Sequence, residues 1–253
     1  MLLRRLFEHL KDQNWFAVGL DLVVVVVGIF LAFQVERWYS EQLLREEARE
    51  RLSQVLEDFA YNERVILQSI SSRARVVGAA LNLLDMDQRG ASASDSGEFY
   101  RQLAAASITL TPRFSRGAYD VLIATGEIDL LEDPELRNSL SDFHARMDEF
   151  MVFNQGMWLV DRNTFEPYVI QNLDHIAMLQ YVHPTNAPIG LGIAQMRPNQ
   201  ESDAFIRVLG NSEFEGVLGA KWHATRDELV RLQRMLSRMP AIRSQLKSSL
   251  DDL

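Results

Sequence analysis

The sequence predicts an all-α protein in which one N-terminal transmembrane helix continues into a domain made of a bundle of long helices. Three observations support this fold class. Residues 15–35 are almost entirely apolar and carry one formal charge, at Asp21. From residue 36 to about residue 87, apolar side chains recur at steps of three, four or seven, and no proline interrupts them. Two later stretches repeat this helical spacing, which favours a bundle over a sheet protein.

The apolar segment 15–35 is the predicted transmembrane helix. At about 1.5 Å per residue it reaches roughly 30 Å, the thickness of the hydrocarbon core of a bilayer. Trp15 and Phe16 open it and Trp38 and Tyr39 follow it, which suits the two headgroup layers. A buried core helix is the alternative, but here apolar residues cover every face. No pair of small residues marks a cleavage site after the segment, so we expect a retained signal anchor.

The flanking regions set the expected domain organisation. Residues 1–14 have apolar side chains on one helical face and charged ones on the other, and we expect a cytoplasmic amphipathic helix lying on the membrane surface. A frayed cytoplasmic tail is the alternative. Residues 36–253 are the expected extracytoplasmic helical bundle domain. Lys and Arg are similarly frequent at the two ends of the span, and long domains translocate regardless of charge. We expect a single-pass protein of the inner membrane, with a cytoplasmic N-terminus and a periplasmic C-terminal domain.

One face of the predicted span carries the residues expected to pack against another helix. Asp21, Gly28 and Ala32 share this face, and the small pair Gly28 and Ala32 permits close helix approach. A carboxylate inside a bilayer normally faces protein or water, although Asp21 could instead reach the nearer interface. Gln34 is a further polar candidate for helix packing. The expected partners are the lipid bilayer and other transmembrane helices, in a homo-oligomer or a membrane complex.

Composition excludes several classes of function. The net charge of -9 argues against a nucleic-acid partner, because such a protein needs a basic surface to displace counterions. The chain has 0 cysteines, which excludes disulfides, thiolate metal sites and a cysteine nucleophile.

Helix boundaries in the exterior domain can be read from capping residues. Ser115 is the expected N-cap of a short helix that ends before Gly126, a left-handed stop. Asp133 followed by Pro134 predicts the start of a long helix that reaches about residue 172.

A final long helix is expected from residue 212 to residue 239, where Pro240 should break or kink it. Helical spacing favours core positions for both Trp158 and Trp222. The apolar face expected for the final helix consists of Phe214, Leu218, Trp222, Leu229, Leu232 and Leu236.

Polar residues on helical faces are the candidate site residues. Asn154 and Asp161 interrupt an apolar seam, where they could set register, line a polar pocket or mark a bend. Two His–Asp pairs, each with its residues one helical turn apart, are candidates for metal ligands, and solvated surface residues are the favoured alternative. These pairs are His144 with Asp148 and His223 with Asp227. No HExxH, GxSxG or P-loop motif is present, so neither a catalytic residue nor a cofactor is predicted.

Two stretches of the chain resemble a bacterial family of single-span membrane proteins of unknown function with a helical exterior domain. The resemblance supports the architecture and implies no activity. Its residues are Asp21, Gly28, Gln34 and Trp38 around the span, and Tyr119, Leu122, Thr125, Gly126, Asp133, Leu136 and Arg137 in the exterior domain. More weakly, the topology and Asp21 are similar to stator B-subunits of ion-driven motors, whose peptidoglycan-binding domain has no counterpart here.

From the sequence we therefore expect a membrane-anchored, non-enzymatic interaction module or accessory subunit of a membrane complex. Two alternatives stay open. One is an ion-coupled, stator-like subunit that uses Asp21, and the other is a helical-bundle sensor that binds a metal or a small ligand.

Overall fold

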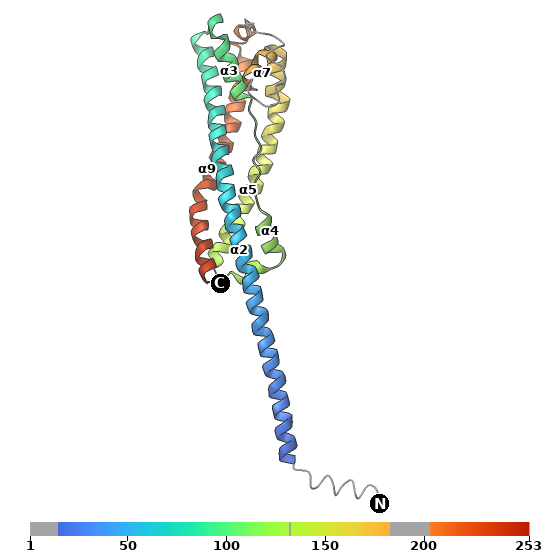
Figure 1. The fold of residues 1–253 in the computed structure, drawn as a ribbon. Coiled ribbons are helices and arrows are strands. Elements are labelled where there is room, and N and C mark those ends of the chain that lie inside the picture. The colour runs from blue at the N-terminus through green and yellow to red at the C-terminus, as the bar shows by residue number, and fades with distance from the viewer. Residues whose placement is uncertain (1–14, 132, 183–202, 253) are drawn as a thin grey trace, which may run out of the picture.

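A computed structural model describes residues 15–131, 133–182 and 203–252 of the chain (Figure 1). Within these ranges every regular element is a helix and no strand is present, which confirms the predicted all-α fold. The amphipathic helix predicted for residues 1–14 lies outside the described residues.

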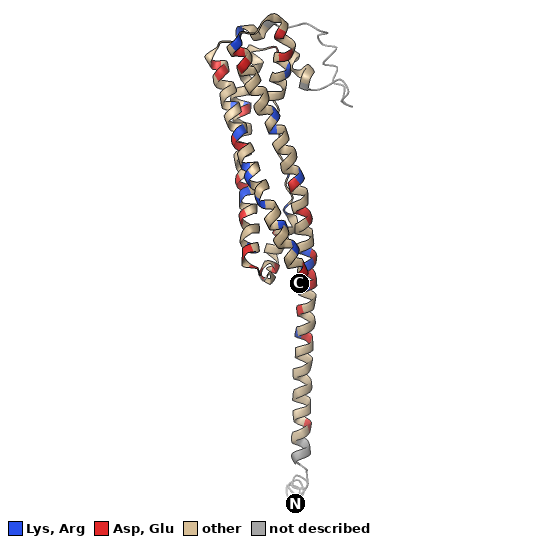
Figure 2. Ribbon diagram, turned by 90° about the vertical axis from the view of Figure 1, so that its left-hand side faces the viewer, with Lys and Arg blue, Asp and Glu red and all other residues tan. Residues whose placement is uncertain are grey.

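Helix α2 (Trp15–Arg89) is the longest element, with 75 residues. At 1.5 Å per residue it extends for about 110 Å, several times the length of an ordinary helix. Its N-terminal part projects from the bundle, and none of its apolar stretch is buried by the rest of the chain (Figure 1). In Figure 2 the apolar stretch shows a long run without coloured positions, and charged positions resume on α2 toward the bundle. Among the residues that the structure describes, one helix, near the N-terminus, is therefore long and apolar enough to cross a membrane.

The bundle begins on α2 at Ala48, which is the first buried side chain of the described residues. From there buried positions alternate by steps of four and three, the heptad spacing of coiled coils. They are Ala48, Leu52, Val55, Phe59, Asn62, Ile66, Ser69, Arg73, Val76, Ala80 and Leu83. The predicted continuation of the span into a long amphipathic helix is confirmed, although three of these core positions are polar.

Helix α9 (Ser212–Asp252) packs antiparallel along α2, because Arg73 pairs with Glu228 whereas Glu63 pairs with Arg243. Its buried positions keep the same heptad spacing: Phe214, Leu218, Lys221, Thr225, Glu228, Leu232, Met235, Met239, Ile242, Leu246 and Ser249. The expected apolar face was thus wrong at several positions. Leu229 and Leu236 lie beside the buried row, which instead contains Lys221, Thr225 and Glu228.

Pro240 lies inside α9, so the predicted break at this residue was wrong, and the alternative that it kinks the helix stays a prediction. Its side chain is exposed, whereas its neighbours Met239 and Ile242 are buried in the core. Burial of these side chains on either side favours continued helix strongly enough to offset the hydrogen bond that proline cannot donate.

Helix α5 (Pro134–Val160) is the third long helix. As predicted, Asp133 is its N-cap, and the Asp133 carboxylate accepts a hydrogen bond of 2.8 Å from the backbone N–H of Glu135. The helical path continues through the π-turn η3 (Asp161–Phe165) and α6 (Glu166–Asn172) to the predicted end. In the π-turn the N–H of Glu166 bonds the carbonyl of Asp161, five residues back. This wider turn lies directly before Pro167, which itself has no N–H to donate.

Shorter elements cover the two ends of the bundle (Figure 1). Four lie at the end far from the projecting part of α2: η1 (Ala93–Asp95), α3 (Ser96–Ala106), α7 (His175–Val182) and η4 (Asp203–Arg207). Two lie near the opposite end, where the C-terminus also lies: α4 (Gly117–Ala124) and η2 (Glu127–Leu130).

The start of α4 is held by α2 rather than by the predicted cap. Ser115 is not the N-cap, since the helix begins after Arg116 and the Ser115 hydroxyl donates to Asp58 at 2.6 Å. The other Asp58 oxygen accepts from the N–H of Ala118 at 3.3 Å, so a residue of α2 caps α4. The side chain of Asn62 bonds both the N–H and the carbonyl of Ser115, each at 2.7 Å. The predicted left-handed Gly126 is confirmed by a φ of 76°.

Two hydrophobic clusters make up the core. The distal cluster joins α3, α6 and α7 to Leu83 of α2 and Leu218 of α9. The proximal cluster, nearer the projecting part of α2, joins α4 and α5 to Phe59 of α2 and Leu232 of α9. Along both α2 and α9, the segment between the two clusters carries buried polar side chains, and these define the candidate site.

Candidate functional site

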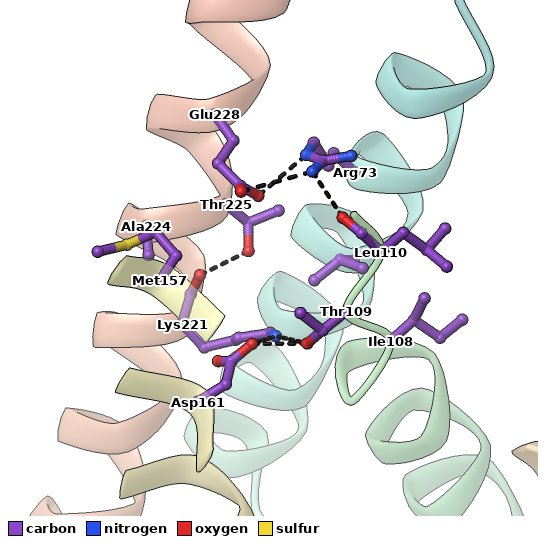
Figure 3. A pocket seen from close by; sticks show the side chains of 11 residues that line it. Arg73, Ile108, Thr109, Leu110, Met157, Asp161, Lys221, Ala224, Thr225 and Glu228 are labelled. Carbon is purple, nitrogen blue, oxygen red and sulfur yellow. Dashed lines mark hydrogen bonds and ion pairs between the residues drawn. The ribbon is translucent and has the colours of Figure 1, made fainter. Parts of the chain in front are cut away.

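The candidate site is a buried polar layer between the two hydrophobic clusters. It combines side chains of α2, α5, η3 and α9 with the extended segment after α3 (Figure 3). We call this set the polar layer: Arg73, Thr109, the Leu110 carbonyl, Asn154, Asp161, Lys221, Thr225 and Glu228.

The first half of the polar layer is centred on the carboxylate of Glu228. Arg73 Nε donates to one Glu228 oxygen at 2.9 Å, and Arg73 Nη2 reaches the other at 3.4 Å. Asn154 Nδ2 also donates to Glu228, at 2.5 Å. The Leu110 carbonyl accepts from Arg73 at 2.9 Å. Arg73, Asn154 and Glu228 are 4%, 2% and 7% exposed. Because water hardly reaches them, these side chains are stabilised by their hydrogen bonds and ion pair with one another.

The second half of the polar layer is centred on Asp161, the first residue of the π-turn. One Asp161 oxygen accepts from Lys221 Nζ and also from the Thr109 hydroxyl, the latter at 2.6 Å. Lys221 donates in addition to Thr109 at 3.1 Å. The Thr225 hydroxyl donates to the Lys221 carbonyl at 2.8 Å, so it needs no partner outside its own helix.

Aromatic rings of the two clusters border the cations. The Arg73 guanidinium lies 5.5 Å from the ring centroid of Phe150, and Lys221 Nζ lies 5.6 Å from that of Phe165. Each contact adds cation–π attraction where water is excluded. The layer therefore holds two cations and two carboxylates in near charge balance.

The space left inside the polar layer is small. Its cavity has a volume of about 20 Å³ and is lined by Arg73, Thr109, Asp161, Lys221 and Glu228 among others (Figure 3). One water molecule needs about 10–15 Å³ and two to four polar partners. The cavity therefore fits a single water, and it is far below the hundreds of cubic ångströms typical of ligand pockets.

Comparisons with protein-family models, with curated proteins and with solved structures found no match to this chain. The role of the polar layer is therefore inferred from its geometry. Polar side chains at core positions of a helical bundle favour one register over its competitors, at some cost in stability. A slip of α9 by one turn, about 5.4 Å, would separate Glu228 from Arg73 and Lys221 from Asp161, so both ion pairs favour the observed alignment.

Of the sequence candidates, the structure brings Asn154 and Asp161 into this common layer. Asp161 also lines the cavity and begins the π-turn, while Asn154 binds the carboxylate of Glu228. Of the roles predicted for these residues, the lining of a polar cavity applies to Asp161, and a role in setting the register stays a prediction.

The two His–Asp pairs lie apart from the polar layer. Because a carbonyl can only accept, His144 Nδ1 carries a proton and donates to the Leu140 carbonyl at 2.8 Å. The His144 ring stacks on Tyr119 at 3.6 Å between centroids, and Asp148 pairs with Arg116 at 2.6 Å. Burial lowers the pKa of His144, partly offset by the Leu140 hydrogen bond.

The second pair is solvent-exposed. His223 Nε2 lies 3.6 Å from the carboxylate of Asp227 on the same helix. Within the described ranges no three His, Cys, Asp or Glu side chains gather into a group that could hold a metal ion.

The candidates on the predicted span lie on the projecting part of α2. Asp21, Gly28, Ala32 and Gln34 are all exposed there. A Cβ built on Gly28 would meet nothing within 4 Å, so the described chain leaves this face open.

Core positions were predicted for both Trp158 and Trp222, and the two residues differ in burial. Trp158 is 40% exposed and lies under the guanidinium of Arg162 at 5.0 Å, so its predicted core position was wrong. Trp222 is half-buried beside the α9 core row, with Arg226 lying 5.4 Å from its ring.

Sequence reasoning missed Arg73, Lys221, Thr225 and Glu228. A signal was present, because steps of three and four continue without interruption from Leu218 to Leu232 only if Lys221, Thr225 and Glu228 count as core positions. Restricting the search for a helical stripe to apolar residues moved the expected face to Trp222 and Leu229.

Proposed function

We propose that this chain is a membrane-anchored, non-enzymatic interaction module or accessory subunit of a membrane complex. The observation that carries the proposal is α2 itself. One uninterrupted helix provides the uncovered apolar stretch and also the first core row of the bundle. A bilayer is the environment in which such a stretch is stable without protein cover.

A scaffolding role is supported by the polar layer. Its charged groups bond one another, and its cavity has room for about one water molecule. We infer that the layer aligns the helices so that their outer surfaces keep one arrangement for binding partners.

The span is the first proposed contact surface. Gly28 has open space around it, and Asp21 on the same face would be stabilised by a polar or cationic group of another transmembrane helix. We place the span in the inner membrane, with a cytoplasmic N-terminus and a periplasmic bundle, consistent with a translocated domain that has no cysteine.

Membrane fractionation tests the anchor. The full chain should stay in the membrane pellet after an alkaline wash and need detergent for extraction. The double variant Val26→Arg/Leu31→Arg should move it to the soluble fraction, because each charge costs about 2.5–3.5 kcal/mol at the centre of a span. Val152→Arg, on the exposed surface of the bundle, is the matched control and should stay in the pellet. Extraction of the unaltered chain without detergent would refute the anchor.

Protease added outside intact spheroplasts tests the orientation. We expect it to digest the bundle and leave a protected N-terminal fragment. A bundle that is digested only after the membrane is permeabilised would place it in the cytoplasm instead.

A further inference from the structure

Helix α5 carries a second apolar stripe on the side that faces away from the core. Val152 and Leu159 are 72% and 48% exposed, Val160 is also exposed and Phe153 is half-buried. With Gly156 these residues follow the spacing i, i+1, i+4, i+7 and i+8, which places them on one helical face. We call them the α5 patch: Val152, Phe153, Gly156, Leu159 and Val160.

The centre of the α5 patch is open. A Cβ built on Gly156 would meet nothing within 4 Å, and apolar side chains flank the glycine on both sides. A second helix could therefore come close to the α5 backbone between these side chains. Contiguous exposed apolar surface of this kind marks interaction sites in soluble domains.

The edge of the α5 patch toward α9 is basic. The Arg231 guanidinium lies over the Phe153 ring at 4.4 Å, which orders its side chain at the border of the patch. Arg238, seven residues later, reaches Asp142 of α5, so Arg234 lies on the same edge of α9. In the described part of the chain neither Arg231 nor Arg234 forms an ion pair, although the whole chain has a net charge of -9.

A second copy is a poor occupant for this surface. Two copies anchored in one membrane would pair in parallel, and each residue on the midline of the patch would face its own counterpart. Glu149 lies seven residues before Gly156 on that midline, so two carboxylates would meet at one end of the contact. Opposed like charges cost several kcal/mol at an interface.

We propose that the α5 patch binds an amphipathic helix of a different protein, with an apolar ridge against Val152 and Leu159 and carboxylates against Arg231 and Arg234. The ridge fills the space around Gly156, and the carboxylates bind the free N–H groups of the two guanidiniums. This proposal rests on the proposed function, because it names a partner surface of the same anchored module.

Site-specific photocrosslinking in the native membrane tests the proposal. A photoreactive phenylalanine analogue replaces Leu159 in the full-length chain, and replaces Ser141 in the control. Ser141 is exposed on the same side of α5, more than four turns away from Leu159. We expect a covalent product from position 159 alone, with a different polypeptide whose crosslinked segment is an acidic amphipathic helix.

Two further variants separate the apolar and the electrostatic contributions. Val152→Asp should reduce the product about tenfold or more, because it places a charge within the apolar contact. Arg231→Glu/Arg234→Glu should reduce it by about as much. Arg207→Glu, an exposed charge reversal at the far end of the bundle, should leave it unchanged.

Three results would overturn the proposal: no product above the Ser141 control, a product that is a dimer of this chain, or a crosslinked segment that is basic or indifferent to the double charge reversal. Fractionation of the same cells keeps this outcome separate from the anchor. A chain that stays in the membrane pellet without a product at position 159 would remove the α5 patch and leave the proposed function in place.

Discussion

Arg73 and Glu228 occupy positions where the heptad spacing of α2 and α9 calls for apolar side chains. Removing two charges from water is costly, and their attraction repays this cost only when the geometry is good and the remaining polar atoms are bonded. In this chain both conditions hold, since Asn154 and the Leu110 carbonyl complete the set.

Removing Arg73 alone should therefore lower the free energy of unfolding more than replacing Arg73, Glu228 and Asn154 together by apolar residues. We expect Arg73→Met to lower the free energy of unfolding by about 3–5 kcal/mol, because the carboxylate of Glu228 stays buried without its cation. The triple variant Arg73→Met/Glu228→Met/Asn154→Leu should recover most of that loss. Denaturant titration of the full chain in detergent measures both. A triple variant less stable than Arg73→Met would show that the polar layer stabilises the bundle outright.

His144 gives the bundle a defined response to acid. Burial against Tyr119 lowers its pKa, the Leu140 hydrogen bond acts in the opposite sense, and the Arg116 charge lowers the pKa further. Below the ordinary histidine value of about 6.5, the unfolded chain binds a proton that the folded chain does not. The free energy of unfolding should thus decrease as the pH falls from about 6.5 to the lowered pKa. Above a pH of about 6.5 it should be independent of this group.

The variant His144→Phe isolates this effect, because it keeps a planar ring against Tyr119 and cannot be protonated. We expect its stability to vary less over the same pH interval in parallel thermal unfolding measurements. Identical pH profiles for the two proteins would show that His144 does not contribute.

At the scale of the elements, the long helices were predictable because their periodicity extends over many turns. The Asp133–Pro134 start and the Gly126 stop were also predictable, since each depends on chemistry within a few residues. The start of α4 was not, because its caps Asp58 and Asn62 lie on another helix. The same limit applied to Pro240, whose helix is maintained by tertiary packing.

Helix α9 should accept a better helix former at its proline. Because the Pro240 side chain is exposed and inside the helix, Pro240→Ala should restore a backbone donor and raise the free energy of unfolding. Alanine is favoured over proline in helix interiors by about 3 kcal/mol, which sets the upper limit for the gain. Ser244→Ala, at another exposed position of α9, is the control for propensity alone and should gain less than about 0.5 kcal/mol. A destabilised Pro240→Ala would indicate that the bundle requires the local distortion.

At the scale of the whole molecule, the polar layer separates two hydrophobic cores that share the helices α2 and α9. The sequence predicted one bundle but not this division, because the division depends on which polar residues face inward. Regions with independent cores can open separately, and hydrogen exchange detects such openings.

We expect Phe99→Ala to cost about 3–5 kcal/mol and to speed amide exchange mainly in α3, α7 and the first turns of α9. Phe143→Ala should act mainly on α4 and on the first half of α5. Mass-spectrometric hydrogen exchange on the full chain in detergent compares the two. Equal acceleration throughout the bundle by either variant would mean that the two cores open as one unit.

The unbroken course of α2 has a mechanical consequence. If the apolar stretch crosses a membrane as proposed, the absence of a hinge between it and the bundle fixes the direction in which the α5 patch faces around the membrane normal. One residue inserted after Ser40 would rotate the patch about the helix axis by about 100° and raise it by about 1.5 Å. Seven inserted residues would leave it within about 20° of its original direction and raise it by about 10 Å. A membrane neighbour that engages both the span and the bundle should tolerate the seven-residue insertion better than the single one. Equal tolerance would mean that span and bundle act without a shared orientation.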